Sequence, residues 1–110
     1  MTKKDVVLEY LKAFCSADLN RLKAVLADKF HLKGPFFEFH SREDYISSLE
    51  GNLVPNCTFE IIRLMEEGED VSVFYHYIKP NTTVHVAQLF RFKNSKVSEA
   101  VLIFDSRNTD

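Results

Sequence analysis

The spacing of the hydrophobic residues changes near Cys57, and this change constrains the fold more than any other feature of the chain. Before it, apolar residues recur at helical spacing: Val7, Tyr10, Leu11 and Phe14 lie at i, i+3, i+4 and i+7. After it, β-branched and aromatic residues follow the period of two that is typical of strands. We therefore predict helices in the first half of the chain and strands in the second.

Three short helices are predicted in the first half. The first spans about residues 4 to 16, and Asp18 is expected to cap the N-terminus of the second. This second helix carries Leu26 on its apolar side and ends before Phe30. The third begins after Ser41, and a short strand near Phe30–Lys33 is expected to join the edge of the sheet.

Four strands are predicted over residues 57–66, 70–78, 84–93 and 96–104. Glu67-Gly68-Glu69 predicts a hairpin turn, Pro80-Asn81 starts a loop, and Asn94-Ser95 predicts a tight two-residue turn. Helices followed by a strand meander indicate the α+β class, in which an antiparallel sheet carries its helices on one face.

Composition and charge restrict the function. A chain of 110 residues is long enough for one domain with its own core, so we expect residues 1–110 to form a single domain. With 14 basic and 16 acidic residues and no basic run beyond Lys3-Lys4, nucleic acid is not an expected partner. No apolar run approaches a membrane span and no signal sequence is evident, so we expect a cytoplasmic protein without a membrane partner.

Several short segments carry a family resemblance. They are Tyr10-Leu-Lys-Ala-Phe-Cys-Ser-Ala-Asp18 followed by Gly34-Pro35, and Gln88-Leu-Phe-Arg-Phe92 followed by Phe104-Asp105. Together with the order of elements, they resemble the nuclear transport factor 2-like superfamily, and its SnoaL-like and ketosteroid isomerase-like members are the nearest match. The resemblance implies a cystatin-like cone, in which a strongly curved antiparallel sheet wraps around three N-terminal helices and leaves an apolar pocket at its open end.

The resemblance also implies a catalytic site. Tyr10 matches the family's hydrogen-bond donor on the first helix, and Gln88 falls where the isomerases place a protonated carboxylic acid. Gly34 stands where those enzymes carry the carboxylate base, and glycine cannot accept a proton. We therefore do not expect steroid isomerisation by the usual route, and His31, His76 or Glu38 is the candidate for moving a proton.

The implied pocket is lined by aromatic side chains around Tyr10 and Gln88: Phe14, Phe36, Tyr45, His76, Phe90 and Phe104. In the isomerase register, Val86, Gln88, Phe90, Phe92, Ala100, Leu102 and Phe104 point inward, as do Phe74 and His76. The outer face then carries Leu89, Val97, Val101 and Ile103. A strand that is apolar on both sides needs a second cover, so we predict a homodimer through the outer face of the sheet, although the helices or an edge loop could also supply that cover.

Two functions of different classes follow. The leading one is binding of a small hydrophobic molecule with a carbonyl or phenol group, with an isomerase- or cyclase-like step as an open extension. The alternative is a non-catalytic, dimeric protein-interaction or accessory module. The spacing of the four histidines fits no metal-ligand motif, so neither a metal nor another cofactor is expected.

Overall fold

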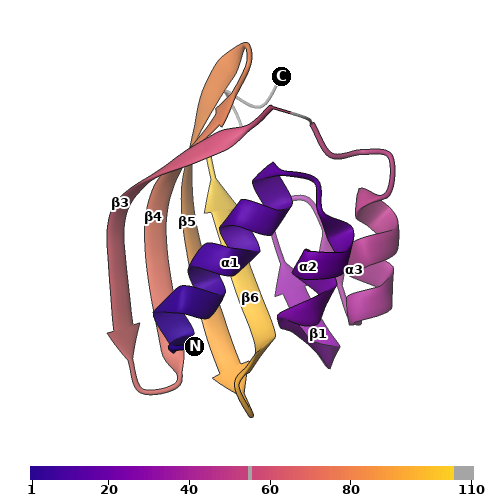
Figure 1. Cartoon of the computed structure of the whole chain (residues 1–110), viewed down its shortest axis with the longest axis vertical. Helices are drawn as coiled ribbons and strands as arrows, with labels where there is room; N and C mark the ends of the chain where they lie inside the picture. Colours follow the sequence, from indigo (N-terminus) through magenta and orange to yellow (C-terminus); the bar gives the residue numbers. More distant parts are fainter. Residues whose placement is uncertain (55, 106–110) are drawn as a thin grey trace.

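The computed structural model describes residues 1–54 and 56–105, which form three helices and six strands (Figure 1). The helices are α1 (Lys3–Cys15), α2 (Leu19–Ala24) and α3 (Arg42–Leu49). The strands are β1 (Leu26–Lys33), β2 (Glu38–Phe39), β3 (Thr58–Glu67), β4 (Asp70–Lys79), β5 (Thr82–Lys93) and β6 (Lys96–Phe104). Within these described residues, no helix is both long enough and apolar enough to cross a membrane.

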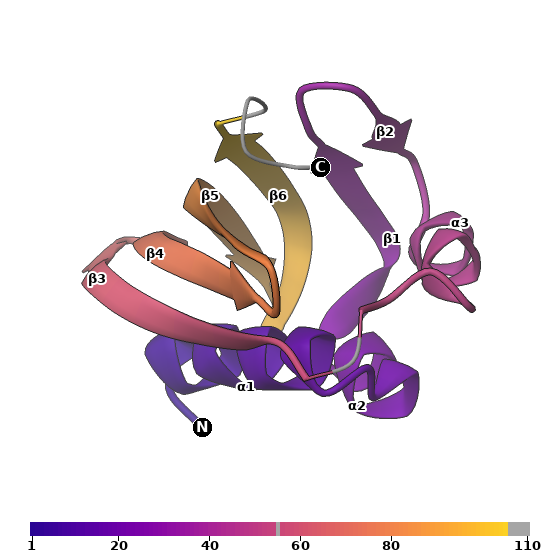
Figure 2. The same cartoon turned by 90° about the horizontal axis from the view of Figure 1, so that it is seen from above.

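All six strands form one sheet in the order β2-β1-β6-β5-β4-β3. Every neighbouring pair is antiparallel except β1 and β6, which run parallel. The sheet is curved, α1 lies across its hollow side, and α3 lies beside β1 (Figures 1 and 2). The predicted α+β cone is therefore confirmed.

The ends of the elements follow from local chemistry. The side chains of Asp18 and Ser41 cap α2 and α3 by accepting hydrogen bonds from backbone N–H groups, as predicted. Asn94 and Ser95 both have positive φ, 52° and 70°, which is the backbone of a type I′ hairpin turn. The predicted strands coincide with β3 to β6 apart from one or two residues at their ends.

The structure corrects the start of β1. Leu26 was expected on the second helix, but α2 ends at Ala24 and Leu26 begins the strand. Leu26 is fully buried and pairs with Val97 of β6 across the parallel ladder. Its spacing from the leucines of α2 fits a helix equally well, so a contact distant in sequence decides between the two structures.

The inward face of β5 agrees with the prediction, because Val86, Gln88, Phe90 and Phe92 are all buried. The prediction for Val97 is wrong: this side chain is fully buried instead of lying on the outer face. Phe92 pairs with Val97 while Arg91 pairs with Glu99, so β6 contains an extra residue at this point. Such a bulge reverses the side to which the following residues point.

The side of β4 that faces the helices is also reversed from the prediction. Tyr75 is only 7% exposed, whereas Phe74 is 45% exposed. Val71 and Val73, which share the face of Tyr75, are fully buried, so Phe74 and His76 lie on the outer face. A slip of one residue exchanges the two faces of a strand, and the aromatic residues on both sides of β4 gave no preference.

Candidate functional site

A partly enclosed apolar cavity of about 220 Å³ lies between α1 and the strands β4, β5 and β6. Apolar and aromatic side chains make up nearly all of its wall, which consists of Leu11, Phe14, Cys15, Phe37, Tyr75, Tyr77, Lys79, Val84, Val86, Leu102 and Phe104. Its volume is below the ~300–1,000 Å³ of sites for drug-sized molecules. The cavity therefore suits a molecule of one or two rings. A larger hollow of about 560 Å³ near Lys12 and Asn56 is a shallow surface groove and gives a ligand little enclosure.

The loop between β1 and β2 lies at this cavity. Phe37 of the loop lines the wall, and the Gly34 N–H donates a hydrogen bond to the Phe37 carbonyl at 2.9 Å. Phe36 is 71% exposed and does not line the cavity, but its ring packs edge-on against Phe104 at 6.0 Å. Of the residues predicted to form the pocket, Phe14 and Phe104 line this cavity.

Four buried polar side chains form a hydrogen-bonded network beside the cavity. The hydroxyl oxygens of Tyr10 and Tyr45 are 2.6 Å apart, and the Tyr75 hydroxyl donates to Gln88 Oε1 at 2.8 Å. Gln88 Nε2 lies 3.5 Å from the Tyr10 hydroxyl oxygen and joins the two pairs. Because Tyr75 also belongs to the cavity wall, the network reaches the cavity through this residue.

Burial controls the protonation of these tyrosines. Loss of hydration disfavours the phenolate, so burial raises the pKa of Tyr10 and raises the pKa of Tyr45 and Tyr75 well above the ordinary value. The network thus offers neutral hydroxyl and amide groups near neutral pH. Groups of this kind donate hydrogen bonds to a carbonyl or phenol oxygen but do not act as bases.

The structure brings together two of the three predicted catalytic residues. Tyr10 and Gln88 are neighbours in the network, although neither lines the cavity. His31 lies apart from them on the outer side of β1, because Phe30 and Leu32 occupy the inward positions. The predicted role of His31 in the pocket is therefore wrong, since its Nε2 instead contacts Glu38 Oε2 at 2.6 Å.

The position of the family's base is filled by another side chain. A Cβ atom on Gly34 would lie 2.5 Å from Cε1 and 2.7 Å from Cζ of the Phe37 ring. The ring therefore occupies the space that a side chain at position 34 would need. Among the described residues that line the cavity, none carries a carboxylate or an imidazole.

Three other predicted pocket residues lie elsewhere. Tyr45 and Phe90 belong to the core: the Tyr45 ring packs against Phe30 at 5.4 Å, and the Phe90 ring packs edge-on against Tyr10 at 4.9 Å. His76 is on the outer face, with its Nδ1 3.2 Å from Glu60 Oε1. Tyr75 and Tyr77 were missed because the wrong face of β4 was assigned, although the alternation from Val71 and Val73 pointed to them.

Comparisons with known proteins agree with this architecture. The sequence model of the SnoaL-like domain matches residues 7–100. The chain therefore belongs to the SnoaL-like domain family, within the nuclear transport factor 2-like fold. A comparison with curated proteins gives no match.

Solved structures share the fold at low sequence identity. An NTF2-like protein of unknown function from Cytophaga hutchinsonii is 23% identical over 97% of this chain and 93% of its own, with a TM-score of 0.84. An LEH-like epoxide hydrolase from Mycobacterium tuberculosis is 17% identical over 96% and 84%, with a TM-score of 0.79. A protein with a ketosteroid isomerase-like fold from Catenulispora acidiphila, solved with trimethylamine, is 17% identical over 92% and 85%, with a TM-score of 0.73. At these identities the similarity shows the fold alone.

Proposed function

We propose that this domain binds a small hydrophobic molecule with a carbonyl or phenol group in the cavity between α1 and the sheet. The observation that carries the proposal is a partly enclosed apolar cavity with Tyr75 in its wall, the residue whose hydroxyl donates to Gln88. An apolar wall with a few convergent polar groups is the usual form of a small-molecule site. Gln88 accepts the hydrogen bond of Tyr75 and orients its hydroxyl.

The proposal is binding, with no proton-transfer step. Isomerase- and cyclase-like reactions need a base within hydrogen-bond reach of the substrate. Gly34 supplies no such group, and the Glu38 carboxylate contacts His31 on the other side of β1. The tyrosines have raised pKa values because they are buried, so they stay neutral. The Tyr75 O–H donates to Gln88 Oε1, so it donates to a ligand oxygen only by exchanging that bond, whereas its oxygen accepts the O–H of a phenol directly.

Calorimetric titration with one- and two-ring phenols and aryl ketones tests this proposal. Val86→Trp should fill the cavity and abolish binding, while Tyr75→Phe should weaken oxygen-bearing ligands about tenfold and leave the matching hydrocarbons unchanged. Ile103→Val, on the outer face, is the matched control and should bind as the wild type does. Binding that survives in Val86→Trp, or the absence of any binding across the panel, would contradict the proposal.

We also propose that a second copy of the chain covers the outer face of the sheet. This face exposes the apolar side chains of Ile62, Phe74, Val101 and Ile103. Phe74, Val101 and Ile103 also line an apolar hollow of about 230 Å³ over β4, β5 and β6. Contiguous exposed apolar surface is typical of interaction sites. The same surface supports the alternative function, a dimeric interaction module, if the cavity proves to bind nothing.

A further inference from the structure

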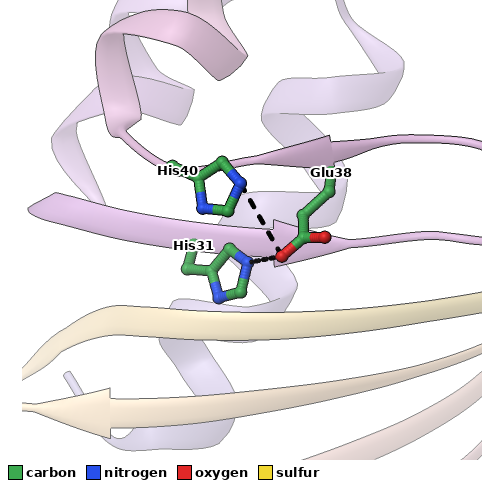
Figure 3. A group of neighbouring side chains, drawn as sticks. All are labelled: His31, Glu38 and His40. Atoms are coloured by element: carbon green, nitrogen blue, oxygen red, sulfur yellow. Dashed lines mark hydrogen bonds and ion pairs between the residues drawn. The ribbon is translucent and has the colours of Figure 1, made fainter.

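The β1–β2 hairpin brings two histidines and a glutamate together at the edge of the sheet (Figure 3). Glu38 Oε2 lies 2.6 Å from Nε2 of His31 and 3.8 Å from Nε2 of His40. The two imidazole rings are stacked, with centroids 5.0 Å apart and an interplanar angle of 13°. Both rings thus direct a nitrogen toward the same carboxylate oxygen.

The register of the hairpin produces this arrangement. Leu32 pairs with Phe39 and Lys33 with Glu38, so the next position along the ladder sets His31 opposite His40. Because side chains alternate along a strand, His31, Glu38 and His40 lie on the side of the hairpin opposite Leu32. Leu32 pairs with the buried Ala100, so the cluster is on the outer face, away from the ligand cavity.

The donor set fits a metal ion. Each of the three residues offers one ligand atom, and these three atoms all lie within 4.8 Å of one another. A transition metal bound at about 2.0–2.2 Å holds tetrahedral ligand atoms about 3.3 Å from one another. Rotation of these partly exposed side chains, moving each ligand atom by about 1 Å, would give that spacing. Two imidazoles and a carboxylate suit zinc and its neighbours in the first transition series.

We propose that His31, Glu38 and His40 bind one divalent transition-metal ion such as Zn²⁺, Co²⁺ or Ni²⁺. Three protein ligands leave the remaining coordination positions to water. The site stands independently of the proposed ligand cavity.

A bound ion would join the two ends of the loop that carries Phe37. His31 precedes this loop in β1, while Glu38 and His40 follow it. Phe37 lines the cavity, so the ion would hold one part of the cavity wall in place. Metal binding is therefore expected to stabilise the native hairpin and raise the melting temperature by mass action.

A second group with the same residue types provides an internal control. On the outer face of β3, β4 and β5, His76 Nδ1 lies 3.2 Å from Glu60 Oε1, and the rings of His76 and His85 have centroids 4.6 Å apart. Among residues 1–54 and 56–105, however, only the group at the hairpin brings three ligand atoms within 4.8 Å of one another. His76→Ala therefore removes a histidine–glutamate pair without affecting the proposed site.

The test is titration of chelator-treated protein with Zn²⁺ by calorimetry and with Co²⁺ by visible absorption, together with melting curves. The wild type and His76→Ala should bind one equivalent and melt at a higher temperature with metal. His31→Ala, His40→Ala and Glu38→Gln should each weaken binding at least tenfold. His40 is 73% exposed, so loss of its side chain should leave the fold intact, as far-ultraviolet circular dichroism would verify.

The proposal is overturned if the wild type binds metal with a dissociation constant above about 100 micromolar, since affinity that weak is of the order of an adventitious site. Equal affinity in the wild type and all three hairpin variants would also overturn it. Strong sulfur-to-cobalt absorption would likewise do so, because it would place the ion at Cys15 or Cys57. Failure of phenols or ketones to bind in the cavity would not count against the metal site, since the cavity is lined by other residues.

Discussion

The hydroxyl oxygens of Tyr10 on α1 and Tyr45 on α3 lie 2.6 Å apart, although the two residues are 35 positions apart in sequence. Both side chains are almost fully buried. Gln88 Nε2 is the other polar neighbour of the Tyr10 hydroxyl, at 3.5 Å. The pair therefore depends on its own hydrogen bond, because water does not reach either hydroxyl.

Removing one hydroxyl of this pair should lower the free energy of unfolding by more than half of the loss that removing both hydroxyls causes. Tyr10→Phe leaves the buried Tyr45 hydroxyl without its partner, and such a group costs about 1–3 kcal/mol. We expect each single variant to lose about 1–2 kcal/mol and the double variant to lose less than their sum, with a coupling of about 1 kcal/mol. Urea unfolding of the four proteins measures this coupling. Additive losses would show that the contact contributes nothing of its own.

The protein should lose stability in alkaline solution. Burial raises the pKa of Tyr10, Tyr45 and Tyr75, so their contribution is fully present below about pH 10, where the unfolded chain also keeps its tyrosines protonated. Above about pH 10 the unfolded chain releases these protons while the folded chain retains them. The free energy of unfolding therefore falls as pH rises through the raised folded values, by up to ~1.4 kcal/mol per pH unit for each tyrosine.

Denaturant unfolding between pH 8 and 11, followed together with tyrosinate absorption, measures this loss. Tyr75→Phe is the comparison, because it removes one of the three groups and should make the fall with pH less steep. Ionisation of all four tyrosines near pH 10 without loss of helical signal would contradict the prediction, since it would mean that the hydroxyls are accessible in the folded state.

The proposed dimer should dissociate when a charge is placed on the outer face. Ile103 is 62% exposed and lies beside the apolar hollow with Phe74 and Val101. A carboxylate buried in a dimer contact loses its hydration, so Ile103→Asp should raise the dissociation constant at least about 100-fold. Light scattering after gel filtration distinguishes one chain from two. Val54→Asp, which changes an exposed apolar residue outside the sheet, should behave as the wild type. A monomeric wild type would disprove the dimer.

The period of the hydrophobic residues predicted most of the fold. The caps at Asp18 and Ser41, the turn at Asn94-Ser95 and four strands followed from residues close together in sequence. What local sequence did not contain was the pairing of Leu26 with Val97 and the bulge near Glu99, which set the start of β1 and the side of Val97. Contacts between distant residues determine both features.

The site was predicted only in part, for a related reason. The resemblance placed Tyr10 and Gln88 together, and the structure agrees. A shift of one residue in register exchanges the two faces of β4. The prediction therefore placed His76 in the pocket, where the structure has Tyr75. The metal-binding cluster has no sequence motif, because His31 and His40 meet only through the pairing of β1 with β2, a two-residue strand that the pattern did not reveal.

The ring of Phe37 occupies the space beside Gly34 that a side chain at this position would need. A Cβ at position 34 would lie 2.5 Å from the ring, so the ring, at the end of a partly exposed side chain, would have to shift. Gly34→Ala should therefore destabilise the wild type by about 1 kcal/mol and have almost no effect in a Phe37→Ala background. Melting curves of the four proteins test this coupling. If alanine at position 34 costs the same in both backgrounds, the Phe37 ring is not what the substitution disturbs.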